Sequence, residues 1–183
     1  MNNFFLLILI IFFSSCSTRF AHSHKIHNYS KTSNLSLYKS QSAKHNVNYK
    51  TVHAICFTES SESPYVIHVN EGKYSGPHRF KTSRSALNYI NRKLQYSNYD
   101  TGICQINSWW LNRLNITPSH LLDKKYNIGL AAKIYSDNLK RCKNEIYCAL
   151  SIYNTGKKKS SIGKKYAHKV LKNRRYLYKN NSY

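Results

Sequence analysis

Apolar residues recur at helical spacing only in the middle of this chain, between about residues 49 and 156. From His22 to about residue 48 the sequence is rich in Ser, Asn, His and Lys and shows no sustained period. Such a segment cannot bury enough apolar surface to offset its conformational entropy. The sequence therefore predicts one small domain over residues 49–156, a disordered basic tether over 16–48, and a basic tail over 157–183.

Most of the elements expected in this domain are helices. Val52, Ile55, Cys56 and Glu59 follow the i, i+3, i+4, i+7 spacing of one helix face, and Ser60 and the residues after it end the helix. Further helices are expected over residues 83–94, 127–141 and 145–153, and an extended segment over 102–107. The predicted fold class is α+β and predominantly helical.

The amino terminus carries a ten-residue apolar run, residues 4–13, followed by Ser14-Ser15-Cys16. The run is shorter than the roughly 20 residues of a membrane span and has the length of a signal-peptide core. Small residues before a Cys are typical of a bacterial lipoprotein site, which makes Cys16 a lipidation candidate. An ordinary signal peptide over residues 1–15 and an uncleaved short anchor are the alternatives. We expect an exported, periplasmic protein.

The charge of the chain points to an anionic partner. There are 29 Lys and Arg against seven Asp and Glu, a formal net charge of +22. A bacterial wall, an acidic membrane surface and nucleic acid all fit such an imbalance. No recognised nucleic-acid motif is present, and the export segment argues against nucleic acid. The basic tail is expected to hold the protein on an anionic wall or membrane, with solubility alone as the alternative.

The scarcity of acids also narrows the search for chemistry. Glu59 closes an otherwise apolar helix face, where desolvation raises the pKa of a carboxyl. A carboxyl of raised pKa can donate a proton near neutral pH. A buried Glu paired with a Lys fits the same periodicity, so the pattern alone leaves both interpretations open.

Three segments occur in a familiar order: Glu59-Ser60-Ser61-Glu62-Ser63-Pro64-Tyr65, then Gly102-Ile103-Cys104-Gln105-Ile106-Asn107-Ser108, then Tyr153-Asn154-Thr155-Gly156. Together they resemble the signature blocks of the soluble lytic transglycosylase domain, which has the goose-type lysozyme fold. The resemblance covers about residues 49–156 and is closest to the group that accompanies type IV secretion, conjugation and invasion systems. The chain departs from the pattern at Cys104 (usually Met), at Ser61 and Ser63 (commonly Gly and Asn), at Thr155 (usually Ala), and in a longer basic insertion between residues 70 and 99.

The resemblance implies a peptidoglycan lytic transglycosylase that cleaves the MurNAc-GlcNAc β-1,4 bond with Glu59 as its acid and with no cofactor or metal. One carboxylate suffices, because the 6-hydroxyl of the sugar closes a 1,6-anhydro ring. The expected role is local wall opening during assembly of a secretion or conjugation apparatus, whose components would then be partners. The saccharide cleft implied by the family is lined by Ser60, Gln105, Asn107, Tyr153 and Asn154. Turn formation and helix capping would explain the same polar residues.

Two other acids are candidates for a second carboxylate. Glu62 lies past the expected helix end, and turn formation explains Asp100. Chemistry with a single acid is therefore favoured over two-carboxylate hydrolysis. A hydrolytic lysozyme on the same fold remains an alternative, as does a catalytically inactive cationic protein with a wall-binding or structural role.

Apart from Cys16, the cysteines are Cys56, Cys104, Cys142 and Cys148. An even number in an exported chain favours disulfides. Cys142 and Cys148 are close in sequence and are expected to pair. Cys56 and Cys104 form a second bridge or remain small buried thiols. The histidines among residues 22–27 are expected to be part of the solvated tether rather than a metal site.

Overall fold

The computed structural model describes residues 35–95 and 97–179. The chain divides into two compact units, residues 1–36 and 37–183. The apolar run 4–13, Cys16 and the histidines of residues 22–27 lie outside the described residues. Within residues 35–95 and 97–179, no helix has the length and apolar character needed to cross a membrane.

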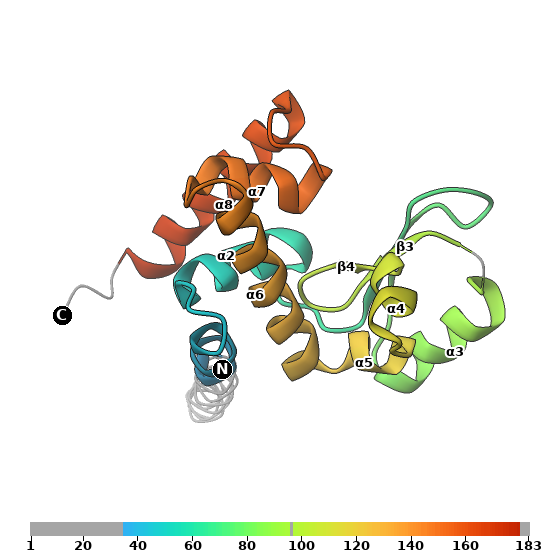
Figure 1. Cartoon of the computed structure of the whole chain (residues 1–183). Coiled ribbons are helices and arrows are strands. Elements are labelled where there is room, and N and C mark those ends of the chain that lie inside the picture. Colours follow the sequence, from blue (N-terminus) through green and yellow to red (C-terminus); the bar gives the residue numbers. More distant parts are fainter. Residues whose placement is uncertain (1–34, 96, 180–183) are drawn as a thin grey trace, which may run out of the picture. The chain divides into compact units, whose positions relative to one another are not determined.

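Helices dominate the fold, and a small antiparallel sheet is inserted between them (Figure 1). In chain order the elements are α2 (Tyr49–Ser60), β1 (Val66–Val69), β2 (Gly76–Arg79), α3 (Ser83–Lys93), β3 (Tyr99–Thr101), β4 (Ile106–Asn107), α4 (Trp109–Leu114), α5 (Pro118–Leu122), α6 (Lys124–Arg141), α7 (Ile146–Thr155) and α8 (Ser161–Tyr178). The predicted class, α+β and mostly helical, is confirmed.

Helix α2 lies at the centre of the larger core. The side chain of Asn48 caps its first turn by accepting from the backbone N–H of Lys50. The helix ends where Ser61 adopts a left-handed conformation and donates its N–H to the carbonyl of Phe57. The expected apolar face is fully buried at Val52, Ile55 and Cys56. It packs with residues of α6, α7 and α8, among them Ile128, Ala131, Leu150, Ala167 and Val170.

A smaller core lies under the sheet, where α3 packs against α5. Its buried members include Ile67, Val69, Ile90, Leu94, Tyr99 and Leu122. The strand order is β2-β1-β3-β4, and every neighbouring pair is antiparallel. Helix α3 agrees with the prediction for residues 83–94. The β1–β2 hairpin was not predicted, because Gly76-Pro77-His78-Arg79 carries no alternating apolar pattern.

The register of the sheet separates an apolar face from a polar face. Ile67, Thr101 and Ile106 are opposite one another and are buried. One residue along, His68 is opposite Asp100 and Asp100 is opposite Asn107. Because side chains alternate between the two faces of a strand, these three polar residues form a row across three strands on the other face.

The structure corrects the expected boundaries of the domain on both flanks. Residues 35–43 are helical, and Tyr38 is fully buried in the larger core, so the tether does not extend to residue 48. The expected tail contains α8, which packs on α2 and α7. A side chain at Gly163 would collide with Ser151 of α7, so the glycine lets the two helices approach closely. Ala167 and Val170 of α8 are fully buried, and the removal of their apolar surface from water favours this packing.

Candidate functional site

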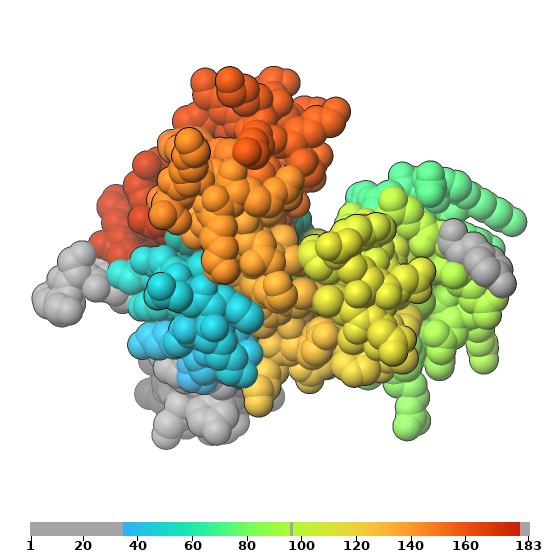
Figure 2. Space-filling view, viewed as in Figure 1, coloured from blue at the N-terminus to red at the C-terminus, as the bar shows by residue number. Residues whose placement is uncertain are grey.

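Glu59 lies in the last turn of α2, where this helix meets α8. The Tyr166 hydroxyl of α8 donates a hydrogen bond to Glu59 Oε1 at 2.6 Å. In the space-filling view the surface is hollowed between α6 to α8 on one side and the sheet with α4 on the other (Figure 2). Substrate-binding sites are commonly found in such concave regions.

The surroundings of Glu59 favour its protonated form. Burial raises the pKa of Glu59 from 4.5 to about 7, and this effect outweighs the hydrogen bond from Tyr166, which lowers the pKa. The negative charge of Asp100 adds to the increase in the pKa of Glu59, and the positive charge of Lys169 opposes it. A carboxyl of this kind holds a proton near neutral pH and can deliver it to a leaving oxygen.

The turn after β3 has a shape that only glycine allows. Gly102 has φ +86°, and a Cβ at this position would collide with the side chain of Asn127 and the carbonyl of Leu121. Asn127 is fully buried; its amide donates to the carbonyls of Thr101 (3.0 Å) and Leu121 (2.8 Å). Its Oδ1 accepts from the N–H of Cys104 at 2.9 Å. Helix α6 thus fixes residues 101–104.

Two further links join this turn to α2. Cys56 and Cys104 form a disulfide. The Ser60 hydroxyl donates to the carbonyl of Ile103 at 2.6 Å. Ser60 is only 2% exposed, so its hydroxyl is engaged with the backbone and does not reach the cleft surface. The residue beside Glu59 braces the site instead of lining it.

Gln105 and Asn107 lie near the polar face of the sheet, but their side chains form hydrogen bonds within the protein. Gln105 has φ +49°, and its amide donates to the carbonyls of Gly102 (2.8 Å) and Val66 (3.0 Å). Asn107 donates to Asp100 Oδ1 at 2.8 Å and to Asn98, while its own Oδ1 accepts from the N–H of Trp109. Of the side-chain oxygens of Gln105 and Asn107, that of Gln105 is the more available to a ligand.

Asp100 lies in the middle of the polar row of the sheet. Each of its oxygens accepts an amide hydrogen bond, one from Asn107 at 2.8 Å and one from Asn70 at 3.0 Å. These two hydrogen bonds hold the Asp100 side chain in place between Asn70 and Asn107. Asp100 is also the acid whose charge raises the pKa of Glu59. The structure therefore gives this residue an electrostatic role beyond the turn that we predicted for it.

The last signature block supplies one side chain to the site and one to the surface. The Tyr153 hydroxyl donates to the carbonyl of Cys104 at 3.0 Å. Burial, and then the charge of Glu59, raises the pKa of Tyr153 well above its ordinary value, so this hydroxyl keeps its proton. Asn154 is exposed at the end of α7. Contacts of Gln105, Tyr153 and Asn154 with a saccharide stay a prediction.

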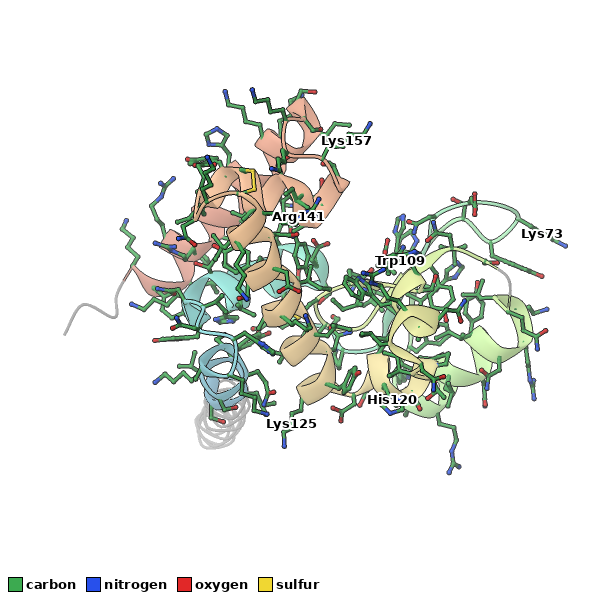
Figure 3. All side chains as sticks on the ribbon, viewed as in Figure 1. Lys73, Trp109, His120, Lys125, Arg141 and Lys157 are labelled. Carbon is green, nitrogen blue, oxygen red and sulfur yellow. A yellow bond between two sulfur atoms is a disulfide. The ribbon has the colours of Figure 1, made fainter. Side chains whose placement is uncertain are left out.

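Trp109 offers an aromatic surface close to this region. Its side chain is 57% exposed, its ring meets that of Trp110 edge-on at 5.0 Å, and Arg113 covers it at 4.8 Å. Figure 3 shows it on the edge of the sheet region that is turned toward the helices. An exposed indole of this kind can pack against the face of a sugar ring.

Glu62 takes part in a different cluster. Its Oε1 lies 3.1 Å from His53 Nε2 and accepts from the Tyr38 hydroxyl at 3.3 Å. The other nitrogen of His53 lies 2.7 Å from the hydroxyl of Tyr178. This cluster joins residues 37–43, α2 and the end of α8. It gives Glu62 a structural role behind the site.

The second expected disulfide, Cys142–Cys148, is present between α6 and α7. Among residues 35–95 and 97–179 there is no group of three or more His, Cys, Asp or Glu that could hold a metal ion. The sequence interpretation missed Tyr166 and Asn127. The apolar spacing of Gly163, Tyr166, Ala167 and Val170 was the signal for α8, and it was obscured by the surrounding lysines.

Tyr166→Phe is expected to move the alkaline limit of activity to higher pH. The substitution removes the hydrogen bond that favours the carboxylate of Glu59, so the pKa of Glu59 rises and the acid stays protonated further into the alkaline range. The measurement is the pH dependence of kcat/KM on peptidoglycan. An unchanged alkaline limb would show that Tyr166 does not control this proton.

Asp100→Asn is expected to have the opposite effect. Removing the charge lowers the pKa of Glu59 and moves the alkaline limb to lower pH. Asn keeps an oxygen that can accept from Asn107, so the sheet is retained. Asp123→Asn, in the cap of α6, is the matched control and is expected to leave the limb in place.

These features define a helical, lysozyme-like domain in which one partly buried acid, Glu59, has a raised pKa. The family model of the transglycosylase SLT domain matches residues 36–175, and the chain belongs to this family. It is a peptidoglycan lytic transglycosylase. Neither the curated proteins nor the solved structures that were compared gave a significant match. The matched range includes most of α8, in agreement with the place of Tyr166 in the site.

Proposed function

We propose that Glu59 is the catalytic acid and that cleavage leaves 1,6-anhydro-MurNAc ends. The observation that carries this proposal is the burial that raises the pKa of Glu59 to about 7 beside a hydroxyl donor. Tyr166 binds Oε1, so Oε2 is the oxygen left to face the substrate. Glu59 protonates the glycosidic oxygen between MurNAc and GlcNAc, and the C1–O bond breaks.

The second step restores the acid. The 6-hydroxyl of the MurNAc residue bonds to C1 and closes the anhydro ring, and its proton passes to the Glu59 carboxylate. No water enters the product, in contrast to hydrolysis. Gln105, Tyr153 and Asn154 are proposed to contact the saccharide, with Ser60 and Asn107 supporting the site from behind.

The test is product analysis. The protein is incubated with purified peptidoglycan, and the released fragments are read by mass spectrometry. Anhydro ends, lighter than hydrated ends by one water, would support the proposal. Absence of any release by a folded protein would favour a wall-binding or structural role.

Hydrolysis remains the second candidate because of Asp100. A hydrolysing glycosidase uses a second carboxylate beside its acid, and the charge of Asp100 acts on Glu59. Hydrated ends in the same experiment would move the assignment to a lysozyme. Release of hydrated ends that Asp100→Asn abolishes would identify the second carboxylate.

The cellular role is proposed from the sequence. Export to the periplasm, with Cys16 as a lipidation candidate, is supported by the apolar run 4–13 and the small residues after it. Local opening of the wall for a secretion or conjugation apparatus is supported by the resemblance of the three signature blocks. Incorporation of labelled fatty acid into the wild type, and its loss in Cys16→Ala, would test the lipid anchor.

A further inference from the structure

A second concave region lies on the helical side of the molecule. It is a pocket of about 660 Å³, within the range of small-molecule sites. Its lining residues come from the end of α6, from α7 and from the start of α8. Neither Glu59 nor any group that shifts its pKa is among them. The pocket is therefore distinct from the candidate active site.

The rim of this pocket is strongly positive. Five of its residues are basic: Arg141, Lys143, Lys158, Lys159 and Lys164. All five are exposed, and within the described part of the chain none of them forms an ion pair. The only acid in the lining, Glu145, accepts the N–H of Cys148 at 2.7 Å and so caps α7. The positive charge of the rim therefore has no local counter-charge beyond this one carboxylate.

Part of the pocket lining is less polar than these cations. It contains the Cys142–Cys148 disulfide, with Cys142 only 7% exposed. The Tyr147 side chain, also in the lining, is 41% exposed, and its ring meets that of His168 edge-on at 5.1 Å. A tyrosine with an apolar ring and a polar tip suits the boundary between water and lipid. Cations beside such groups match a phosphate group attached to an apolar body.

The basic surface continues along α8. Lys164, His168, Lys172 and Arg175 are spaced by four, four and three residues, which puts them on one side of the helix. All four are exposed. The helix has 18 residues and is therefore roughly 27 Å long. A single bound ion would need no such extension, whereas a flat surface with many anions would contact the pocket and the helix together.

The orientation of α7 keeps this surface separate from the substrate. Tyr153 points toward Cys104 and Glu59, while Tyr147 and Ser151 line the pocket. At about 100° per residue, Tyr147 and Ser151 lie roughly 120–160° around the helix from Tyr153. A partner held at the pocket would leave the cleft open to glycan strands. Figure 3 marks Arg141 and Lys157 in this part of the molecule.

We propose that this basic pocket, together with the basic side of α8, docks the enzyme onto the surface of an anionic phospholipid bilayer. The phosphate groups lie at the cationic rim, and the exposed Tyr147 ring lies among the lipid headgroups. An anionic wall polymer would pair with the cations but offers no apolar part to the disulfide and the Tyr147 ring. The proposal does not depend on the cleavage chemistry, so the two can fail separately.

The test compares two triple variants of the full chain that carry the same net charge. One removes three charges around the pocket (Lys143→Gln, Lys158→Gln, Lys164→Gln), and the control removes three exposed charges elsewhere (Lys73→Gln, Lys81→Gln, Lys125→Gln). Each lowers the formal charge from +22 to +19. Co-sedimentation is measured with vesicles of phosphatidylglycerol and phosphatidylcholine, relative to vesicles of phosphatidylcholine alone. This ratio cancels any insertion of the apolar run 4–13.

The pocket variant is expected to lose on the order of 100-fold in its preference for anionic vesicles, about fivefold per lysine, while the control loses less than roughly tenfold. Cleavage of lipid-free peptidoglycan is expected to be unchanged in both, which also shows that they fold. Equal losses in the two variants would mean that net charge alone binds the bilayer, and the proposal would be wrong. Weaker binding to lipid-free sacculi with unchanged vesicle binding would assign the pocket to a wall polymer.

Discussion

Glu59→Gln is expected to reduce the rate of peptidoglycan cleavage on the order of 10²- to 10⁴-fold, the range that general acid catalysis contributes. The amide occupies the same space as the carboxyl, and its oxygen can still accept the hydrogen bond from Tyr166. It cannot deliver a proton to the leaving oxygen. Initial rates of fragment release from purified sacculi measure the effect.

The same substitution is expected to stabilise the fold at alkaline pH. The pKa of Glu59 is about 7 in the folded protein and near 4.5 when unfolded, so between these values the folded state binds the additional proton. The free energy of unfolding of the wild type therefore falls as pH rises from about 4.5 to 7, by at most roughly 3 kcal/mol. The neutral amide of the Glu59→Gln variant avoids this loss. The variant should therefore be more stable than the wild type at pH 8. At pH 5 the difference in stability should be much smaller.

Urea unfolding at pH 5 and pH 8 measures the expected difference in stability between the variant and the wild type. Full activity in Glu59→Gln would refute the acid assignment. A stability difference that is equal at both pH values would show that burial does not control the proton of Glu59. A variant that is stable but inactive would support both the acid role of Glu59 and the effect of burial on its proton.

Removing the Cys56–Cys104 disulfide is expected to have the largest effect on stability. The bridge closes a loop with a sequence separation of 48, and loop-closure entropy assigns it about 4 kcal/mol. The Cys142–Cys148 bridge, with a separation of six, is assigned about 2 kcal/mol by the same argument. Denaturant unfolding of the two double Cys→Ser variants compares them directly.

The two bridges should also differ in their effect on activity. Cys56–Cys104 joins α2 to the turn that carries Gln105, so its loss loosens both sides of the site. The Cys142–Cys148 bridge lies in the lining of the basic pocket and joins neither α2 nor the turn that carries Gln105. We expect a large fall in kcat/KM for the first variant and little change for the second. Equal activities at a temperature where both are folded would contradict a bracing role.

The sequence predicted the parts of the fold that carry a clear apolar period. The apolar face of α2 and the position of α3 agree with the structure, and the helix expected over residues 145–153 corresponds to α7. The β1–β2 hairpin was missed because its second strand contains Gly and Pro and is half exposed. Helix α8 was missed because its lysines outnumber its small buried residues, so composition hid the spacing of Ala167 and Val170.

The site was predictable only as far as motifs reach. Glu59 could be found from its place on an apolar face and from its signature block. The influence of Tyr166 and Asp100 on Glu59 could not be predicted, because it comes from tertiary packing between segments far apart in sequence. Ser60 and Asn107 show the reverse case: their residue types suit a sugar, but the fold uses their hydrogen bonds internally.

The distance in sequence between Glu59 and Tyr166 has a consequence for the folding of the enzyme. The two residues are 107 positions apart, and Tyr166 belongs to α8. Domains generally fold as units, and the larger core here includes residues of both α2 and α8. A nascent chain that stops before residue 161 carries the acid but neither its partner nor the helix that covers α2. The surroundings that set the pKa of Glu59 are therefore complete only when α8 has packed on α2.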